Sequence, residues 1–432
     1  MRVQTISCKL KLECNSEQRL ALNALVTAYQ GALNFASKTA FDLGKTSSAS
    51  KIQKTTYHEI RAKWGTLPTT MICGVARQVG SIYKTLWTRA KQHKDNLKKG
   101  WTRKQYKGLN RAPIFKSKTA TLFYRNDYSW SKDHIVSVTT LNGRIKLKYS
   151  GYQKHLDLIK SGSHCGAARL WYDKTSKQWY LIVSIELQSP DVDFSSLWKV
   201  KGIDVGQRNL LVSVDSEGQV VFKKGGLVKA KCRHYAKVRS GLQEKGTRSA
   251  KRALVRLSMR ERRFRSDVNH KLALSVLEPS TLIGVEDLTG IRERLRRRTG
   301  KRASEKQRQA NRDSSSWSYA ELQWFITYKS FFFDSIVVAV DPRNTSKGCS
   351  KCGHISDGNR PNGSVLFRCQ ACGRVVHSDK NGGDSILQRT VVKRQDLLVM
   401  GCLSITPKVS NVDGSSATGV QVQQVNLRND LN

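Results

Sequence analysis

Two Cys-x-x-Cys pairs near the C-terminal end restrict the fold of this chain more than any other feature. The first pair is Cys349 and Cys352, and the second is Cys369 and Cys372. Pairs at this spacing are typical of a zinc ribbon, in which four thiolates hold one Zn²⁺ tetrahedrally and leave no coordination position open. A redox pair or four unrelated thiols would not require two matched pairs. We therefore expect a structural Zn²⁺ bound by these four cysteines.

The excess of positive charge is the second constraint. The 432 residues include 76 Lys and Arg against 33 Asp and Glu, a formal net charge of +43 at pH 7. A compact state with this charge repels itself unless a polyanion neutralises it, so a nucleic-acid partner is favoured over a merely basic soluble protein. The sequence has no apolar run of membrane-spanning length and no signal-peptide core at its start. We expect a cytoplasmic, nucleoid-associated protein with no membrane partner, and its other six cysteines to be thiols.

Cationic clusters supply the candidate contacts with nucleic acid. Between residues 101 and 118 aromatic residues are interleaved with cations, and two interpretations stay open. The aromatics stack on bases while the cations bind phosphates, or the segment is a basic linker whose aromatics pack inward. Further clusters lie in the polar segment 292–312, expected to become ordered on a partner, and in the ribbon. The candidates are Arg103, Lys104, Lys116, Lys118, Arg296, Arg297, Arg298, Lys351, Arg368 and Arg374.

The first half of the chain has the pattern of a β-rich domain with inserted helices. Alternating apolar residues predict a strand over 2–12, and helical periodicity predicts helices from about residue 15 and over 70–99, with a loop at 47–50. Two hairpins follow, and with the first strand they could close a small barrel. The hairpin strands are expected at 134–139, 144–149, 168–172 and 179–187.

A second domain begins near residue 200. Three short strands joined by tight turns are followed by a long amphipathic helix, a fourth strand and a fifth strand. This is the element order of an RNase H-like fold. The strands are expected at 201–206, 209–214, 219–222, 281–286 and 335–340.

Three carboxylates occupy matching places in that order. Asp204 is expected mid-strand on the first strand, and Glu286 ends the fourth, so adjacent strands bring the two acids together. Two carboxylates that lie so near each other repel unless a cation neutralises them. Two divalent ions would meet that need, activate water and stabilise the leaving oxygen of a phosphodiester. For the third acid we choose Asp379, at the start of the last helix, over its rival Asp384. The ribbon lies between the fifth strand and this helix, and can therefore orient Asp379.

The motifs together resemble a known family. Gly202-Ile-Asp-Val-Gly206 resembles the first RuvC motif of the TnpB (OrfB) transposon-encoded nucleases and of the compact type V CRISPR effectors, and Val285-Glu-Asp-Leu288 resembles the second. The segment from Asn344 to Gly353 is similar to their zinc-ribbon entry, and Asp379-Lys-Asn-Gly-Gly383 to their third motif. The third motif of relatives often reads Asn-Ala-Ala with a later Asn. Here Gly382, Gly383 and Ser385 stand at those places.

The resemblance implies an RNA-guided DNA endonuclease. Asp204, Glu286 and Asp379 would be the catalytic residues and would hold Mg²⁺, with Mn²⁺ as a substitute, while guide RNA and target DNA would be the partners. The implied fold is α+β and multidomain: a β-barrel-like wedge with a helical recognition insertion, then a RuvC-like domain with an inserted zinc ribbon. The expected ranges are 1–14 with 119–190 for the wedge, 15–118 for the recognition lobe, 200–345 with 376–390 for the RuvC-like domain, 346–375 for the ribbon and 391–432 for a weakly ordered tail.

Two other functions are compatible with the same pattern. One is a catalytically weak RNA-guided DNA-binding protein of the same fold, which the complete set of three acids argues against. The other is a RuvC-like resolvase that uses no guide, which the large basic insertions argue against. The sequence does not distinguish a monomer from a homodimer.

Overall fold

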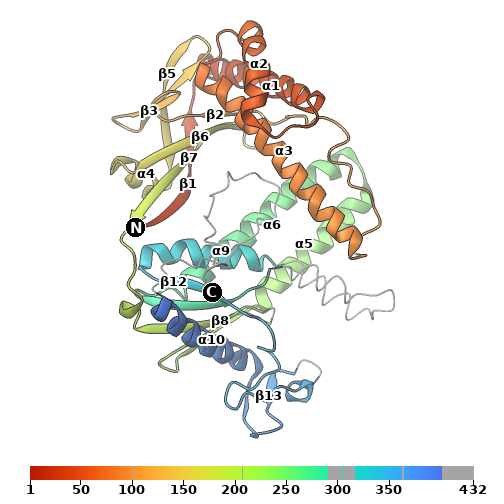
Figure 1. The fold of residues 1–432 in the computed structure, drawn as a ribbon, viewed down its shortest axis with the longest axis vertical. Coiled ribbons are helices and arrows are strands. Elements are labelled where there is room, and N and C mark those ends of the chain that lie inside the picture. The colour runs from red at the N-terminus through yellow and green to blue at the C-terminus, as the bar shows by residue number, and fades with distance from the viewer. Residues whose placement is uncertain (101, 207, 290–303, 305–316, 362–363, 401–432) are drawn as a thin grey trace, which may run out of the picture. The chain divides into compact units, whose positions relative to one another are not determined.

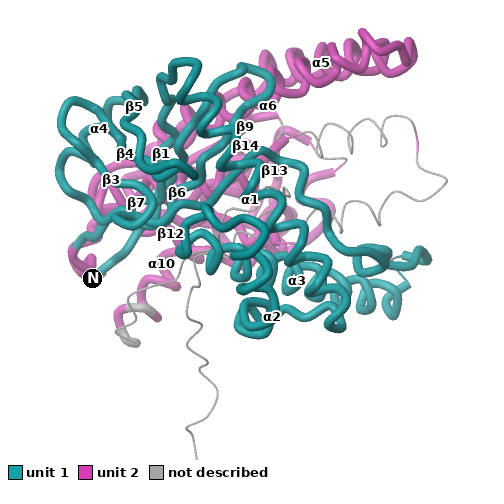
Figure 2. The backbone as a smooth tube through the Cα atoms, turned by 90° about the horizontal axis from the view of Figure 1, so that it is seen from above, with its two compact units in different colours: residues 1–189 teal, residues 190–432 magenta. Residues whose placement is uncertain are grey.

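The computed structural model describes every residue except 101, 207, 290–303, 305–316, 362–363 and 401–432 (Figure 1). The chain divides into two compact units, residues 1–189 and 190–432, which are coloured separately in Figure 2. Among the described helices, none combines the length and the apolar character that crossing a membrane requires.

A seven-stranded antiparallel sheet forms the core of the first unit, with the strand order β2-β6-β7-β1-β5-β4-β3. Inward side chains alternate with outward ones, as in β7, where Trp179, Leu181, Val183 and Ile185 are all buried. The strands are β1 Arg2–Glu13, β2 Thr119–Leu122, β3 Tyr128–Ser131, β4 Ile135–Thr140, β5 Gly143–Gly151, β6 His164–Asp173 and β7 Gln178–Ser189.

This sheet curls into a barrel-like shape, as the sequence predicts. Its two edge strands, β2 and β3, are joined by a short connection in the chain. The gap is bridged by side chains of β3, because the Tyr128 hydroxyl donates to the Gly166 carbonyl at 2.7 Å and Trp130 Nε1 donates to Cys165 Sγ at 3.3 Å. Both acceptors lie on β6.

The inserted helices of the first unit are α1 Ser16–Asp42, α2 Ala49–Lys63 and α3 Thr69–Lys98. Asn15 and Gln18 form a capping box at the start of α1, with each side chain accepting from the other's backbone N–H. The expected loop at 47–50 is wrong in part. Ser48 caps α2 by accepting from Lys51 N at 3.3 Å, so the small polar residues there begin a helix. A short helix, α4 Gln153–Lys160, was also not expected, since two turns show little periodicity.

The second unit contains a five-stranded sheet in the order β10-β9-β8-β11-β12. β8, β9 and β10 are antiparallel, while β11 is parallel to both β8 and β12. This agrees with the order expected of an RNase H-like fold. The strands are β8 Lys199–Asp204, β9 Asn209–Asp215, β10 Val220–Lys224, β11 Thr281–Glu286 and β12 Ile336–Val340.

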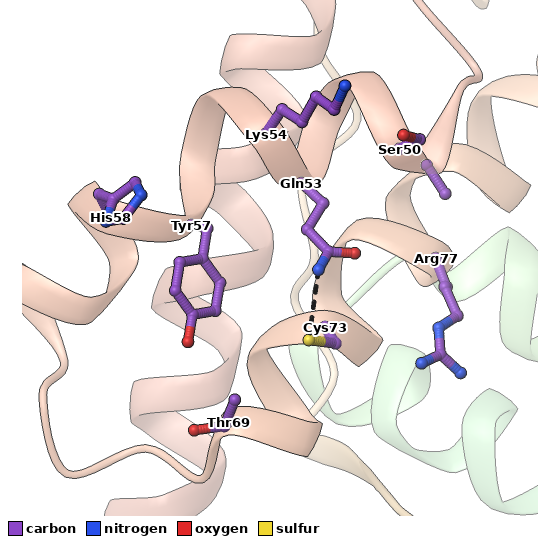
Figure 3. A pocket seen from close by; sticks show the side chains of 9 residues that line it. Ser50, Gln53, Lys54, Tyr57, His58, Thr69, Cys73 and Arg77 are labelled. Atoms are coloured by element: carbon purple, nitrogen blue, oxygen red, sulfur yellow. Dashed lines mark hydrogen bonds between the residues drawn. The ribbon is translucent and has the colours of Figure 1, made fainter.

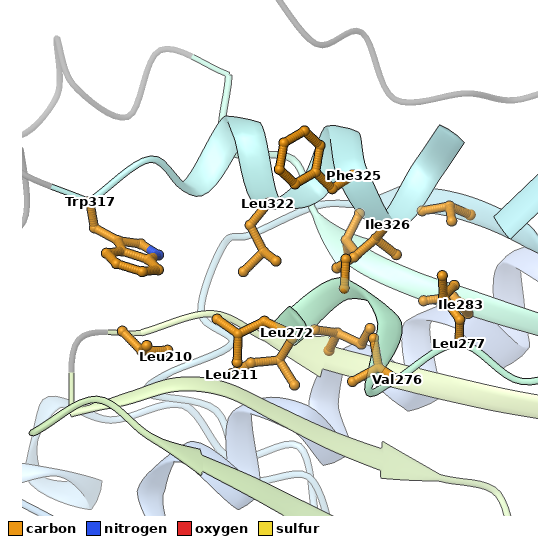
Figure 4. Packing of buried hydrophobic residues seen from close by; sticks show 14 residues of the cluster. Leu210, Leu211, Leu272, Val276, Leu277, Ile283, Trp317, Leu322, Phe325 and Ile326 are labelled. Atoms are coloured by element: carbon orange, nitrogen blue, oxygen red, sulfur yellow. The ribbon is translucent and has the colours of Figure 1, made fainter. Parts of the chain in front are cut away.

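Helices cover both faces of this sheet. One face packs on α6 and α9 through a buried cluster that includes Ile203, Ile283, Leu272 and Phe325 (Figure 4). The opposite face packs on α10, through Leu387 against Val200, Leu282 and Val338. The long helices are α5 Gly226–Lys245, α6 Arg248–Leu274, α9 Tyr319–Ser330 and α10 Ser378–Met400, and the short 3₁₀ turns are η1 Phe194–Ser196, η2 Phe331–Phe333 and η3 Asp357–Asn359.

Two expectations about helices need correction. The single long helix expected after β10 is α6, and α5 precedes it. Gly246, at φ +62°, ends α5 in a left-handed conformation, and Thr247 caps α6 by accepting from Ala250 N at 3.1 Å. The last helix α10 continues to Met400, into the segment expected to be a weakly ordered tail; the rest of that tail lies outside the described residues. A two-stranded hairpin of the ribbon, β13 Leu366–Arg368 and β14 Val375–His377, precedes it.

Candidate active site and zinc centre

Strand register places Asp204 and Glu286 side by side. β8 and β11 pair in parallel with Ile203 opposite Val285, so one further step sets Asp204 beside Glu286. Ile203 and Val285 point into the core on the α6 side, and the two acids therefore face the opposite side, toward α10. Asp204 is the last residue of β8. The expectation that it lies mid-strand is wrong, because the pairing of β8 with both neighbours ends there.

Glycines let α10 approach this face closely. A Cβ atom at Gly202 would lie 2.4 Å from both Gly383 O and Leu387 N, backbone atoms of α10. One at Gly382 would lie 3.1 Å from Asp204 Oδ2, and one at Gly383 would lie 2.7 Å from Val214 Cγ2. The glycines that replace the alanines of the resembled motif therefore have a packing role here. They bring the first turn of α10 against the end of β8.

Asp379 lies in that first turn and both of its carboxylate oxygens have partners. Asn209 Nδ2 donates to Oδ2 at 2.8 Å, and Arg360 Nη2 lies 3.5 Å from Oδ1. The backbone N–H of Asp379 donates to Nδ1 of His377 at 3.2 Å. These contacts fix the carboxylate on the side of α10 that faces the strands.

Glu286 is held from a different direction. Thr345 Oγ1, which is buried, donates to Glu286 Oε1 at 2.5 Å. The backbone carbonyl of Glu286 accepts from Gln323 Nε2 of α9 at 2.8 Å. The end of β11 is thus tied both to α9 and to the segment that leads into the ribbon.

The electrostatics of the three acids favour a bound cation. Burial, followed by the neighbouring charges of Glu286 and Asp379, raises the pKa of Asp204 to about 8, against a lowering contribution from Arg360. A carboxylate in this setting is costly to ionise unless positive charge joins it. The residues therefore fit a divalent metal bound by oxygen ligands.

Asp384 has a different environment from Asp379. Arg374 Nη2 lies 2.8 Å from its Oδ2, and Lys380 Nζ lies 3.0 Å from the same atom. Two cations already neutralise this carboxylate. That pairing supports Asp379 over Asp384 as the third acid.

The four cysteines form the candidate zinc centre. Among the residues that the structure describes, Cys349, Cys352, Cys369 and Cys372 are the one group of three or more His, Cys, Asp or Glu whose ligand atoms all lie within 4.8 Å of one another. The Sγ atoms of Cys349 and Cys372 are 3.8 Å apart and those of Cys352 and Cys369 are 3.5 Å apart. Tetrahedral Zn²⁺ at about 2.3 Å from each sulfur requires such separations.

Backbone donors also suit thiolates at this centre. The N–H of Lys351 donates to Cys349 Sγ at 3.4 Å and that of Cys372 to Cys369 Sγ at 3.5 Å. The N–H of Cys372 lowers the pKa of the Cys369 thiol, which falls to about 6. Zinc binds the thiolate form, so these donors favour the metal-bound state.

The candidate nucleic-acid contacts are scattered in the structure. Arg103, Lys104 and Lys116 are exposed, while Lys118 Nζ donates to Asn23 Oδ1 at 3.1 Å. Lys351 and Arg368 are exposed on the ribbon, whereas Arg374 donates to Asp384 and to Ser350. The segment with Arg296, Arg297 and Arg298 lies outside the described residues.

Two aromatic residues of segment 101–118 have contacts with the inserted helices. The Tyr106 ring lies 5.8 Å from the ring of His93 on α3. The backbone of Phe115 is bound on both sides to Asn34 of α1, with its N–H donating at 2.7 Å and its carbonyl accepting at 3.2 Å.

A cationic groove between α2 and α3 was not anticipated from the sequence (Figure 3). Its volume is about 700 Å³. Gln53 Nε2 donates to Cys73 Sγ across its floor at 3.4 Å. The described residues that line it include no Asp or Glu; they are Ala49, Ser50, Gln53, Lys54, Tyr57, His58, Thr69, Cys73 and Arg77. The lining suits an anionic ligand.

Three residues at the acids were not assigned a role from the sequence. Asn209 begins a predicted strand, and its neighbours in the sequence give no indication that its side chain has a functional role. Arg360 was one of several ribbon cations. Thr345 stands within the motif that resembles the zinc-ribbon entry. That motif was the one feature of the sequence that could have indicated a role for Thr345.

Comparison with known proteins gives two segment matches and several relatives. Residues 197–290 match the family OrfB_IS605, described as a probable transposase, and residues 319–386 match the Cas12f1-like TNB domain. The chain is 28% identical over 249 residues to the CRISPR-associated endodeoxyribonuclease Cas12f1 of Sulfoacidibacillus thermotolerans, covering 54% of this chain and 55% of the relative. It is 32% identical over 188 residues to a TnpB-like protein of Methanocaldococcus jannaschii, covering 41% of this chain and 64% of the relative. These matches span between half and two thirds of the relatives' lengths.

The fold has a counterpart among solved structures. A cryo-EM structure of a Cas12f1–sgRNA–target DNA complex is similar with a TM-score of 0.56 and 17% sequence identity, covering 85% of this chain and 82% of that chain. This similarity confirms the expected α+β multidomain fold. Together with the sequence matches, it confirms the resemblance to TnpB proteins and compact type V CRISPR effectors.

Proposed function

We propose that this chain is an RNA-guided DNA endonuclease that cleaves at a single RuvC-like site formed by Asp204, Glu286 and Asp379. The observation that carries the proposal is the convergence of these acids from β8, β11 and α10, with the pKa of Asp204 raised to about 8 by burial and by the other two. Clustered buried carboxylates lower the stability of the fold, and groups with such strongly shifted pKa values occur preferentially at functional sites.

The three carboxylates have the ligand chemistry for two Mg²⁺ ions, for which Mn²⁺ can substitute. When bound, two such ions supply an activated water and charge stabilisation of the leaving oxygen in phosphodiester hydrolysis.

The surrounding side chains orient the acids and prepare the site for a phosphate. Asn209 and Thr345 each donate one hydrogen bond to a carboxylate, which limits rotation of Asp379 and Glu286. Arg360 presents its guanidinium beside Asp379. With metal bound at the acids, this guanidinium would be available to bind a non-bridging oxygen of the scissile phosphate.

The proposed partners are guide RNA and target DNA. The net charge of +43 requires a large polyanion. A relative named as an endodeoxyribonuclease and a similar fold solved with sgRNA and target DNA make a guided mechanism the leading choice. In this proposal base pairing sets the target, and the protein contacts the backbone.

The domain assignment follows from the same proposal. The barrel-like sheet, residues 1–14 with 119–190, serves as the wedge, and residues 15–118 as the recognition lobe. Residues 200–345 with 376–390 form the nuclease domain. The ribbon, residues 346–375, binds a structural Zn²⁺, since four thiolates leave no open position for chemistry.

The test combines RNA sequencing with a cleavage assay. RNA that copurifies with the chain is sequenced, its guide segment is reprogrammed, and matched DNA is incubated with Mg²⁺ or with EDTA. We expect cleavage of matched DNA in Mg²⁺ alone and none by Asp204→Ala. Guided binding without cleavage by the unaltered chain would support a catalytically weak binding protein, and cleavage of branched DNA without RNA would support a guide-free resolvase.

A further inference from the structure

Asn381 connects α10 to the first knuckle of the zinc ribbon. Its side chain is fully buried. Oδ1 accepts from the backbone N–H of Ser350 at 3.1 Å and from Ser350 Oγ at 3.0 Å. Nδ2 donates to the carbonyl of Gly348 at 2.8 Å. One amide therefore binds the backbone on both sides of Cys349.

Ser350 is the point at which ribbon and helix meet. It lies between the two cysteines of the first pair and is itself buried. Its carbonyl accepts from Gln388 Nε2, two turns further along α10, at 2.5 Å. Its Oγ accepts from Arg374 Nη1 at 2.8 Å. Every polar group of Ser350 is thus bound, which leaves this part of the ribbon little freedom relative to α10.

Asn381 is two residues after Asp379, so the two side chains project about 200° apart around the helix. Asn381 faces the ribbon, whereas Asp379 faces Asn209 on β9. A displacement of the first turn from the ribbon would therefore move the carboxylate relative to β8 and β11. There the backbones of Gly202 and Gly383 lie close together, so the position of α10 sets the distance of Asp379 from β8.

We propose that Asn381 is a positioning residue that transmits the geometry of the zinc-bound knuckle to Asp379, and that the affinity of the carboxylate site for Mg²⁺ depends on it. The inference rests on the proposed nuclease function. It adds to that function a specific link between the structural metal and the catalytic one.

A second buried asparagine provides a matched control. Asn359 is also fully buried. Its Nδ2 donates to the carbonyls of Lys347 and His354 at 2.8 and 3.1 Å, and its Oδ1 accepts from Gln370 N at 2.9 Å. All these partners belong to the ribbon. Asn359 therefore holds the ribbon together, whereas Asn381 joins the ribbon to α10.

The experiment compares Asn381→Ala and Asn359→Ala in the full chain with guide RNA. Zinc content, guided DNA binding in EDTA, hydrogen exchange of residues 379–383, and the Mg²⁺ dependence of cleavage are measured. Asn381→Ala should retain zinc and DNA binding, exchange faster in the first turn of α10, and require about 10- to 100-fold more Mg²⁺ for half-maximal cleavage. Saturating Mg²⁺ should restore much of the rate. Asn359→Ala should lose zinc.

Ser350→Ala is the milder variant, because the backbone N–H of residue 350 still donates to Asn381. It should shift the Mg²⁺ dependence less than Asn381→Ala, and the double variant should be no worse than Asn381→Ala alone. Unchanged exchange and Mg²⁺ dependence in both single variants would overturn the proposal, as would zinc loss from Asn381→Ala equal to that from Asn359→Ala. If the unaltered chain cuts no DNA, the nuclease proposal fails, while zinc content and exchange still decide whether Asn381 holds α10.

Discussion

Asn209 Nδ2 donates a hydrogen bond to Asp379 Oδ2 at 2.8 Å, between residues 170 positions apart in the chain. The donor begins β9 and the acceptor lies in the first turn of α10. The contact occupies one carboxylate oxygen with a neutral donor, while the other oxygen lies 3.5 Å from Arg360 Nη2 and 3.4 Å from Ser378 Oγ. Rotation of Asp379 is thereby restricted before any metal binds.

Asn209→Ala should reduce guided cleavage by about 10- to 100-fold, the usual effect of removing a partner that orients a metal ligand. Guided DNA binding in EDTA should be unchanged. The measurement is single-turnover cleavage over a range of Mg²⁺ concentrations.

Asn269→Ala is the control for loss of a buried amide. Asn269 is fully buried in the same unit and donates to Glu321 Oε2 at 2.8 Å, within the helical layer. Its removal should lower the melting temperature and leave the cleavage rate of the folded protein near normal. A similar rate loss in both variants would assign the effect at Asn209 to stability alone.

Gly202→Ala should destabilise the second unit. The added Cβ would lie 2.4 Å from Gly383 O and from Leu387 N, both backbone atoms of α10. A side-chain rotation cannot relieve these contacts, so α10 must move away from β8. We expect a loss of at least about 1–3 kcal/mol in the free energy of unfolding, as for overpacked cores, together with loss of cleavage.

Urea unfolding of the second unit measures this change. Gly226→Ala is the control, since nothing lies within 4 Å of the Cβ it would add; that variant should be as stable as the unaltered chain. Equal stability of Gly202→Ala and Gly226→Ala would mean that α10 is not held as closely as the structure has it.

Strands β9 and β11 could be predicted from the sequence because they are short, largely apolar segments, whereas β8 alternates Lys199 and Lys201 with other residues. β8, β9 and β11 consist mostly of buried residues, and Asp204 and Glu286 interrupt that pattern at strand ends. Their proximity followed from the order of the elements. The exact position of Asp204 within β8 could not be predicted, because the point at which strand pairing ends depends on the neighbouring strands.

Other features depend on tertiary contacts that leave no local pattern. In α5 the buried residue is Cys232. The helix therefore has no apolar stripe from which its presence could be predicted. Asn209 and Arg360 reach Asp379 only because β9 and the ribbon are brought to the start of α10. Asn381 looks like any polar residue in a helix until the backbone of Gly348 and Ser350 is placed against it.

A buried ion network should make the second unit sensitive to acid. Lys199 Nζ lies 3.1 Å from Asp215 Oδ2 and 3.1 Å from Glu278 Oε2, and its side chain is 6% exposed. Burial alone would raise the pKa of Asp215 and of Glu278. Hydrogen bonds from Lys199 to Asp215, and from Lys201 and Lys199 to Glu278, outweigh burial, so both pKa values are lowered.

The sign of the pH effect follows from those directions. A carboxyl group whose folded pKa lies below its unfolded value of about 4 contributes stability above that value and loses it as pH falls through the folded pKa. Thermal melts should therefore show decreasing stability below about pH 5.

Lys199→Met tests the network at neutral pH. It removes the buried cation and leaves Asp215 without it, which should cost about 3–5 kcal/mol. Lys271→Met is the control, because its ion pair with Asp267 is exposed, at 75% and 57%, and contributes at most about 1 kcal/mol. If both variants have the same melting temperature, the buried network does not stabilise the fold.

Asp204→Asn should stabilise the metal-free protein while abolishing cleavage. Burial, Glu286 and Asp379 raise the pKa of Asp204 to about 8, so the folded state disfavours the ionised carboxylate that the unfolded chain carries at neutral pH. The amide removes this charge and its repulsion. In EDTA at pH 8 we expect a melting temperature a few degrees higher than that of the unaltered chain, since about 1 kcal/mol shifts it by about 2–4 °C in a unit of this size.

The difference should shrink as pH falls toward about 4, where the unfolded carboxyl group is protonated as well. Saturating Mg²⁺ should raise the melting temperature of the unaltered chain more than that of Asp204→Asn, because the unaltered chain has all three carboxylates to bind the cation. A lower melting temperature for Asp204→Asn in EDTA would contradict the view that this site gives up stability for metal binding.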